Sequence, residues 1–323
     1  MTVLVTGATG FVGQHLVTKL IEQRHAVRVL VRPSSDTSRL PAGVNVVSGD
    51  LGTDDRLDDA VRDCDIVYHL AAAHGVDAGA EDCERVNVHG TLNLAEAAAR
   101  AGVHRFLFSS TRGVHGLVRG GSVDENTPLS PDTAYRRSKV QAERELGRLS
   151  AARKLPVITL RLPSMIGPGA VGWLGLFRAV ARGNFRIIGS GENRQHPCPI
   201  DDAVQAILLA GTTPGIGGET FVFSGTDAVT TAAFVRMIAQ EFGVEISRVR
   251  LPLFPYRAIH WAHVAAAHLG GRAASHSRAE FYSMDYRIDD GKARRVLGYS
   301  PVTPLASAVR STAAWYRTRG LVS

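Results

Sequence analysis

The chain has 323 residues, of which 45% are hydrophobic, and it carries a formal net charge of +7. This length and composition are those of a soluble globular protein that can bury a large core. The basic residues are scattered, and no basic run alternates with aromatic residues. The positive charge therefore does not indicate nucleic-acid binding.

The three cysteines bear on the compartment. Cys64, Cys83 and Cys198 are odd in number and lack metal-ligand spacing, which predicts a reduced compartment without a disulfide framework. The first residues run directly into a predicted strand and leave no room for a signal segment, so we expect a cytoplasmic protein. The longest apolar stretch, residues 258–269, contains three histidines and falls short of the roughly 20 residues that a membrane span needs. We expect no contact with a membrane.

In the first half, short β-branched runs alternate with helical patterns. The predicted elements are strands at Thr2–Thr6, Ala26–Val31, Asn45–Ser48, 66–70, 105–108 and 157–161, and helices at 10–24, 54–62, 83–101 and 133–153. Strands separated by helices at this spacing predict an α/β fold with a doubly wound parallel sheet of the Rossmann type. Such sheets bind ligands at the carboxyl ends of their strands.

The pattern loosens after Arg161, where loops rich in glycine and proline separate helices predicted at 202–210, Thr231–Phe242 and 304–316. We therefore expect two domains. Residues 1–165 would form the dinucleotide-binding domain with the catalytic helix. Residues 166–323 would form mainly a smaller substrate-binding lobe, partly interleaved with the first domain.

Three glycines follow the first strand and open the first helix. Gly7 permits a tight turn, Gly10 lets backbone amides approach a pyrophosphate, and Gly13 allows the helix to pack closely on the strand. The helix N-terminus offers unpaired N–H groups and the positive end of its dipole to phosphates. The expected cofactor contacts of this turn are Gly7, Thr9, Gly10, Phe11, Val12 and Gly13. The alternative is a glycine turn with a structural role only.

The residues after the second strand bear on the form of the cofactor. NAD enzymes usually place an acid there to hold the ribose 2′-hydroxyl, but this chain has Val31 followed by Arg32. The planar guanidinium of Arg32 can pair with a 2′-phosphate, assisted by Ser34 or Ser35. We therefore favour NADP(H) as the cofactor. NAD(H) stays possible, because Arg32 could be a solvated surface residue and Asp36 could bind a ribose.

Tyr135 and Lys139 are four residues apart on a predicted helix, so they lie on one face. A carbonyl that receives a hydride becomes an alkoxide, and its site needs a positioned acid and a second hydrogen-bond donor. Tyr135 supplies the acid, and we expect Lys139, together with the positive charge of the nicotinamide in the oxidised complex, to lower its pKa. Lys139 should also hold the nicotinamide ribose. The second donor is expected among the three hydroxyl residues that end 24 residues before Tyr135, at position 111.

These motifs, in this order, resemble the extended short-chain dehydrogenase/reductase family over essentially the whole chain. The segments that carry the resemblance are 6–13, 49–51, 69–72, 87–91, 108–111, 135–139, 161–164, 167–168 and 200–203. The resemblance implies that residues after several strands contact the cofactor. Asp50 and Leu51 are expected at the adenine, and Ala71 and Ala72 beside the cofactor. The others are Asn87 in the middle of the site, Ser109 at the strand end, and Arg161, Leu162, Pro163 and Ser164 at the nicotinamide.

The resemblance also implies a set of catalytic residues. Thr111 occupies the family's Ser/Thr position, so the expected catalytic group is Thr111, Tyr135 and Lys139, with Ser110 as the nearby substitute for Thr111. The residues expected to contact substrate are Ser110, His74 and Arg194. No metal site is expected, because His260 and His263 lack a third ligand.

Departures from family patterns narrow the choice of branch. Sugar-nucleotide dehydratases place Asp-Glu after the catalytic threonine, whereas this chain has Arg112 and Gly113 there, which argues against dehydration. Sugar-nucleotide epimerases usually have an arginine followed by Asp-Phe, and this pattern is absent near Arg194. The C-terminal part, including residues 256–269 and 292–301, instead resembles hydroxysteroid dehydrogenases and dihydroflavonol reductases.

The favoured function is an NADP-dependent oxidoreductase that transfers hydride between nicotinamide and a carbonyl or alcohol of a fairly apolar small molecule. The alternatives are an NAD-dependent sugar-nucleotide epimerase and a non-catalytic cofactor sensor. Family resemblance also suggests a homodimer formed by the helices at 83–101 and 133–153. Its predicted apolar surface consists of Val86, Leu92, Leu94 and Leu146.

Overall fold

The structure is a computed structural model that describes residues 1–53, 56–74, 78–256, 258 and 278–322. Its centre is a sheet of seven parallel strands in the order β11-β7-β5-β4-β1-β2-β3. The strands are β1 (Thr2–Thr6), β2 (Ala26–Val31), β3 (Asn45–Ser48), β4 (Ile66–His69), β5 (Arg105–Thr111), β7 (Val157–Leu162) and β11 (Thr220–Val222). The strand order reverses between β1 and β4, where sheets of this kind bind their ligands. The expected α/β fold of Rossmann type is confirmed.

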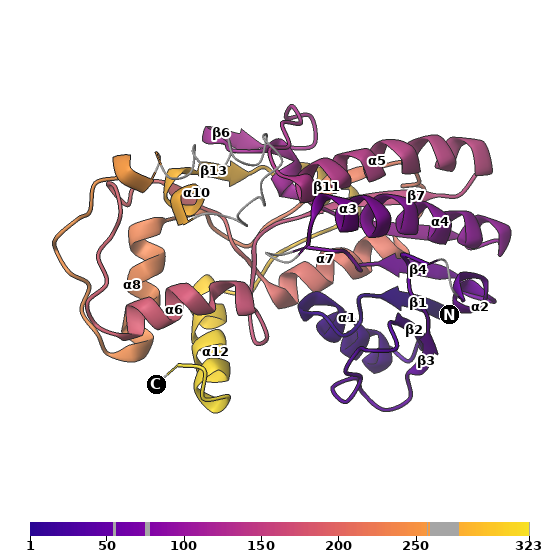
Figure 1. Ribbon diagram of the computed structural model, residues 1–323, viewed down its shortest axis with the longest axis horizontal. Helices are drawn as coiled ribbons and strands as arrows, with labels where there is room; N and C mark the ends of the chain where they lie inside the picture. The colour runs from indigo at the N-terminus through magenta and orange to yellow at the C-terminus, as the bar shows by residue number, and fades with distance from the viewer. Residues whose placement is uncertain (54–55, 75–77, 257, 259–277, 323) are drawn as a thin grey trace.

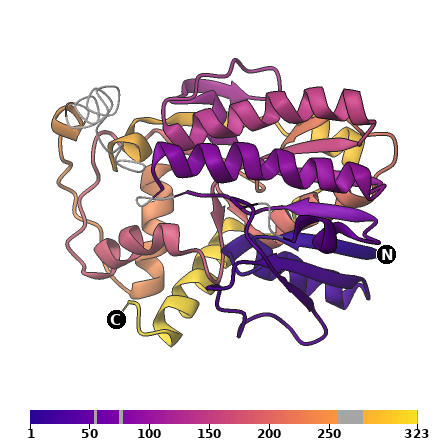
Figure 2. The same ribbon diagram turned by 45° about the vertical axis from the view of Figure 1, so that its right-hand side comes forward.

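Helices cover both faces of this sheet (Figures 1 and 2). One face carries α1 (Phe11–Glu22), α7 (Ile200–Thr212) and α11 (Gly291–Leu297), and the other carries α2 (Leu57–Val61), α4 (Thr91–Arg100) and α5 (Ala134–Arg153). Strand β1 shows how the sequence serves both layers. Val3 and Val5 pack with α1, whereas Leu4 between them packs with α4, as the two-residue period of a strand requires.

Two local features place the site residues. Strand β5 runs to Thr111, three residues beyond the expected end, and continues into a 3-10 turn, η2 (Arg112–His115). Helix α5 begins after Thr133, whose hydroxyl accepts a hydrogen bond from the Arg136 amide at 3.2 Å. The helix expected at 83–101 begins three residues earlier with α3 (Ala80–Asp82), and the expected range itself is divided into a π-helical segment η1 (Cys83–Gly90) and α4.

The second half of the chain forms a lobe beside the sheet and also returns to the sheet. The lobe contains η3 (Val171–Trp173), α6 (Leu174–Ala181), α8 (Thr231–Phe242), α10 (Arg278–Ser283) and α12 (Leu305–Thr318). Phe177, Phe234 and Tyr316 are buried in its core. Helix α7 and strand β11 come from the same half but belong to the central sheet and its cover.

Short strand pairs connect distant parts of the chain. The pairs are β8 (Met165–Ile166) with β10 (Cys198–Pro199), β9 (Arg194–Gln195) with β12 (Val229–Thr230), and β6 (Arg119–Val123) with β13 (Asp285–Ile288). None of these pairs was predicted from the sequence. His260 and His263, and most of the apolar segment 256–269, lie outside the described residues.

Candidate active site

The glycine turn between β1 and α1 has the geometry that a dinucleotide requires. Gly7 has φ +72°, and a Cβ added there would lie 2.7 Å from the Ala71 amide nitrogen. A Cβ on Gly13 would lie 2.1 Å from the Gly7 carbonyl oxygen, so only glycine lets α1 start this close to the strand. Gly10 caps α1 without a side-chain hydrogen bond. The first amides of the helix, from Phe11 onward, are thus available to a pyrophosphate.

A buried histidine ties the end of β4 to this turn. His69 Nδ1 lies 2.7 Å from Thr6 Oγ1, and His69 Nε2 lies 2.8 Å from Thr91 Oγ1. Thr6 Oγ1 also accepts a hydrogen bond from the Ala71 amide at 3.2 Å. Burial, with a smaller effect of the Lys139 charge, lowers the pKa of His69 to about 3, so the ring is neutral at pH 7. From the sequence, His69 was recognised only as part of a motif.

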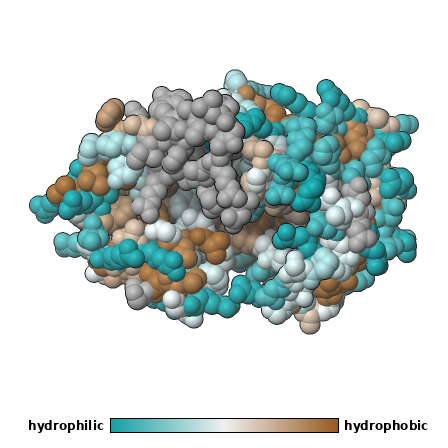
Figure 3. All heavy atoms as spheres, viewed as in Figure 1, coloured by the Kyte–Doolittle hydropathy of each residue, from teal (hydrophilic) through white to brown (hydrophobic). Residues whose placement is uncertain are grey.

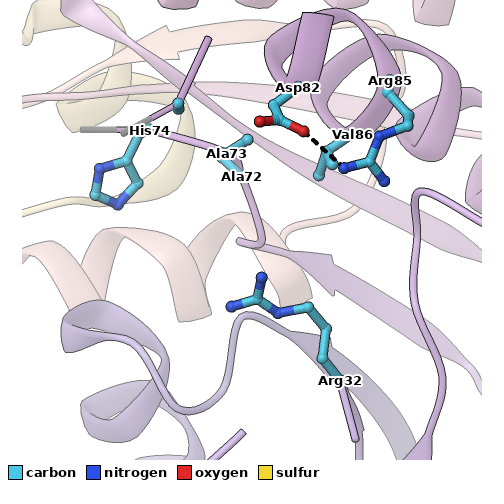
Figure 4. A pocket seen from close by; sticks show the side chains of 8 residues that line it. Arg32, Ala72, Ala73, His74, Asp82, Arg85 and Val86 are labelled. Atoms are coloured by element: carbon cyan, nitrogen blue, oxygen red, sulfur yellow. Dashed lines mark hydrogen bonds and ion pairs between the residues drawn. The ribbon is translucent and has the colours of Figure 1, made fainter. Parts of the chain in front are cut away.

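A pocket of about 390 Å³ lies at the ends of β2 and β4 (Figure 4). The residues that line it are Arg32, Ala72, Ala73, His74, Ala78, Asp82, Arg85 and Val86. Arg32 is exposed, and none of the described carboxylates pairs with it. Asp36 instead accepts a hydrogen bond from the Ser38 amide at 2.9 Å, and this interaction with Ser38 lowers the pKa of the Asp36 carboxyl. Ser34 is exposed in the same loop.

The loop after β3 holds the two residues expected at the adenine. The Asp50 carboxylate accepts a hydrogen bond from the Gly52 amide at 2.8 Å and keeps its second oxygen for other donors. Leu51 is buried in the core that α4 covers, and its backbone lies against Gly90. The Leu51 side chain therefore faces the core, and only its backbone can contact a cofactor.

Lys139 lies under the end of β5. Its ammonium donates to the Ser109 carbonyl at 2.8 Å and lies 4.6 Å from the centre of the Phe108 ring. The residue is only 1% exposed. Burial lowers the pKa of Lys139 to about 7, while Glu143 and Cys83 act in the opposite direction.

Tyr135 begins the same face of α5. Burial raises the pKa of its phenol to about 12, Cys83 adds to the rise, and Arg136 opposes it. Burial therefore dominates the pKa of Tyr135 in the protein alone, and the prediction that Lys139 and an oxidised nicotinamide together lower it, which concerns the complex, stays a prediction. The phenol holds its proton throughout the neutral range.

The three hydroxyls at the end of β5 differ in their partners. Thr111 Oγ1 accepts from the Gly113 amide at 3.1 Å, which leaves its O–H free to donate. Ser110 is 2% exposed, and its hydroxyl has no hydrogen-bond partner among the described residues. Ser109 contributes its carbonyl to Lys139. Thr111 and Ser110 thus both retain a donor for a substrate oxygen.

Asn87 has most of its hydrogen-bonding capacity in use within the chain. Its amide oxygen accepts from the Ala73 amide at 2.7 Å, and its amide nitrogen donates to the Ala73 carbonyl at 2.9 Å and to Ser138 Oγ at 3.0 Å. Ser138 in turn donates to the Tyr135 carbonyl at 2.8 Å. Asn87 therefore connects the chain after β4 to the first turn of α5, and one acceptor lone pair is left for a ligand.

The end of β7 is only partly as expected. Leu162 pairs in register with Thr111, so Leu162, Pro163 and Ser164 start at the edge of the sheet where the site lies. Arg161 points elsewhere. It forms a buried ion pair with Glu143 at 2.8 Å and donates to the Glu125 carbonyl at 3.0 Å. The prediction that Arg161 borders the nicotinamide is thus wrong, because its side chain faces α5.

Of the residues expected to contact substrate, His74 lies against the Tyr135 ring, whereas Arg194 is an exposed residue of β9. The His74 and Tyr135 rings meet edge to face with centroids 6.2 Å apart. Partial burial, together with Lys139, lowers the pKa of His74. Arg194 is exposed in β9, and its backbone amide is bound to Asp285 at 2.9 Å.

Comparison with known proteins agrees with this geometry. The model of the NAD dependent epimerase/dehydratase family matches residues 3–223. The chain belongs to this family. It is therefore an NAD(P)-dependent enzyme that acts on hydroxyl or keto groups, and the resemblance to extended short-chain dehydrogenases/reductases is confirmed.

Several family members align with nearly the whole chain. Sterol demethylase protein B of Methylococcus capsulatus is 29% identical and is covered over 100% of both chains. A 4-hydroxy-2-methyl-3-oxo-4-farnesyl-3,4-dihydroquinoline-1-oxide ketoreductase of Stigmatella aurantiaca is 28% identical over 93% of this chain and 92% of its own. A UDP-glucose 4-epimerase of Vibrio cholerae is 26% identical over 97% and 94%.

Solved structures match the fold of this family member. The crystal structure of gox2253 superposes with a TM-score of 0.83 at 29% identity and covers 100% of this chain and 99% of its own. The dTDP-glucose 4,6-dehydratase DesIV of Streptomyces venezuelae, solved with NAD and TYD bound, has a TM-score of 0.79 at 26% identity and covers 100% of this chain and 99% of its own.

Among the described helices, none has both the length and the apolar composition of a membrane span.

Proposed function

We propose that the chain is an NADP-dependent oxidoreductase that interconverts a carbonyl and an alcohol on a fairly apolar small molecule. The observation that carries the choice of NADP(H) is Arg32. It lines the pocket without a carboxylate partner among the described residues, while the nearby Asp36 is bound to the Ser38 amide. An unpaired guanidinium at the end of β2 favours a 2′-phosphate over a ribose hydroxyl.

The residues at the end of β5 and on α5 fit the proton transfer that accompanies the hydride transfer. The bound nicotinamide supplies or accepts the hydride. Tyr135 holds its phenolic proton at neutral pH and delivers it to the oxygen that becomes the alcohol. The Thr111 hydroxyl, which still has a free donor, stabilises the developing negative charge on that oxygen. Lys139, with a pKa of about 7, provides a group beside Tyr135 that can exchange a proton at neutral pH.

Apolar residues of the lobe near the cofactor turn support an apolar substrate. His15 on α1 lies 2.9 Å from the Pro168 carbonyl, so the loop that leads to η3 and α6 borders the cofactor turn. Val171 in η3 is 66% exposed. Hydrophobic residues gather over α6 on the face shown in Figure 3. The printed name of the Stigmatella aurantiaca ketoreductase includes a farnesyl group, which agrees with this choice.

The second candidate function is a sugar-nucleotide epimerase, which the Vibrio cholerae relative favours. That reaction requires residues that hold a nucleotide in the lobe. Arg194, the sequence's one match to such a residue, is exposed, and within the part of the chain that the structure describes only its backbone is bound. The reductase function is therefore preferred.

Replacing Arg32 tests the choice of cofactor. Charge-assisted phosphate contacts contribute roughly 1.5–3 kcal/mol, so Arg32→Ala should remove about a 10- to 150-fold preference for NADPH over NADH. Fluorescence titration of both cofactors measures this ratio, with Arg39→Ala as a control for charge in the same exposed loop. An unchanged ratio in Arg32→Ala would overturn the assignment.

Three further parts of the proposal concern organisation. We retain residues 1–165 and mainly 166–323 as cofactor and substrate domains, and a cytoplasmic location. We also propose a homodimer through η1 and α4, which correspond to the helix expected at 83–101, and through α5. Leu94 and Leu146 are fully buried in their own chain, so the prediction that they form dimer surface is wrong, and Val86 and Leu92 are half-buried. Sedimentation that shows a monomer at micromolar concentration would reject the dimer.

A further inference from the structure

The pocket wall opposite Arg32 carries a second arginine, Arg85, to which the sequence assigned no role (Figure 4). Arg85 lies on the π-helical segment η1. Its Nη2 donates to the Asp82 carboxylate at 2.7 Å, one turn earlier. This ion pair fixes where the guanidinium lies, and it raises the pKa of Arg85 further above its ordinary value.

The guanidinium of Arg85 lies directly on the backbone of Gly52. A Cβ added to Gly52 would be 1.9 Å from Arg85 Nη1 and 3.0 Å from its Cζ. Gly52 follows Asp50 in the loop at the carboxyl end of β3. The absent side chain at position 52 therefore makes the space that Arg85 occupies.

The order of the strands places one end of a dinucleotide beside this arginine. The glycine turn at the end of β1 fits the pyrophosphate, and the direction through β4 and β5 leads to Tyr135 and hence to the nicotinamide. The other half of the cofactor must extend over β2 and β3. Its adenine then reaches the β3 loop, where a planar guanidinium can stack on an aromatic face.

We propose that Arg85 covers the adenine ring of the bound cofactor, with Asp82 holding its guanidinium in place and Gly52 making room for it. The inference rests on the proposed function only in requiring a dinucleotide. Adenine is common to NADPH and NADH, so Arg85 contributes to affinity for both, whereas Arg32 distinguishes between them.

The test compares NADPH, NADH and AMP on the full chain by calorimetry. Arg85→Ala should raise all three dissociation constants by a similar factor, about three- to tenfold, as expected for a partly exposed guanidinium–ring contact. Arg85→Lys should restore little of this affinity, because an ammonium is not planar. The matched control is Arg100→Ala on the neighbouring α4, which breaks an exposed ion pair with Asp58 on α2 and should change none of the three dissociation constants.

A second variant keeps the test independent of the loss of Arg85. Gly52→Ala should displace the flexible guanidinium and weaken all three ligands, and its effect should disappear when Arg85 is already alanine. Additive effects of Gly52→Ala and Arg85→Ala would overturn the proposal. So would unchanged binding in Arg85→Ala, or a loss confined to NADPH, which would make Arg85 a phosphate ligand. A wild-type preference for NADH would refute the proposed role of Arg32 without bearing on that of Arg85, because NADH also carries an adenine.

Discussion

At the end of the site formed by α5 and β5, Lys139 is buried and Tyr135 is half-buried, whereas Arg32 and Arg85 at the other end are exposed to solvent. Burial shifts the pKa of Lys139 down to about 7 and that of Tyr135 up to about 12. At the exposed end, charge and shape are available to a ligand directly. Burial thus sets the protonation of the two groups at one end, whereas at the other end an exposed charge is available to a ligand, and we propose that this charge selects the cofactor.

Tyr135→Phe should have the largest effect on turnover while leaving cofactor binding at the other end of the site unchanged. The ring that fills the space remains and only the proton donor is lost, so turnover should fall by about 10²- to 10⁴-fold. The dissociation constant of NADPH, measured by fluorescence, should stay close to that of wild type. A parallel loss of NADPH binding would show that the phenol serves the cofactor rather than the proton transfer.

Gly13→Ala should disturb the glycine turn, which lies between the two ends of the site. The new Cβ would meet the Gly7 carbonyl at 2.1 Å and the Ala8 Cα at 2.7 Å, so α1 has to move away from β1. We expect a loss of about 1–3 kcal/mol in the free energy of unfolding and weaker binding of both cofactors. Gly147→Ala on α5, where nothing lies within 4 Å, should instead stabilise the protein by about 0.5–1 kcal/mol. Equal denaturation midpoints for the two variants would contradict this account.

His69 should make the stability of the crevice sensitive to acid. The pKa of its imidazole falls from 6.5 to about 3 on folding, so between these values the unfolded chain binds a proton that the folded chain does not. The contribution to stability is present above pH 6.5 and is lost as the pH falls, by about 1.4 kcal/mol for each pH unit. Urea unfolding of wild type and His69→Gln at pH 7.5 and pH 5 measures the difference. The same loss in both proteins would exclude His69 as the source.

The parts of the site that depend on local sequence could be predicted. The glycine turn needs only Gly7 and Gly13 at a fixed spacing, and Tyr135 and Lys139 share a face on any α-helix. Most strand and helix positions followed for the same reason, because the alternation of apolar residues is a local signal.

The parts that depend on packing between distant segments could not be predicted. The pKa of Tyr135 is set by how much of the fold encloses it, and the direction of Arg161 by its pairing with Glu143 on α5. Strand β11 has three residues and carries too little pattern to be recognised, although it completes the sheet. Arg85 is significant only because the fold brings it onto Gly52, 33 positions earlier in the sequence.

Net hydride transfer with NADPH is tested most directly by following NADPH absorbance while the purified protein reacts with a panel of apolar ketones and aldehydes, and by quantifying the alcohol formed. We expect one NADPH to be oxidised for each alcohol produced, with cofactor that exchanges freely. Protein that retains non-exchangeable NAD and interconverts nucleotide-sugar epimers without net cofactor consumption would contradict it.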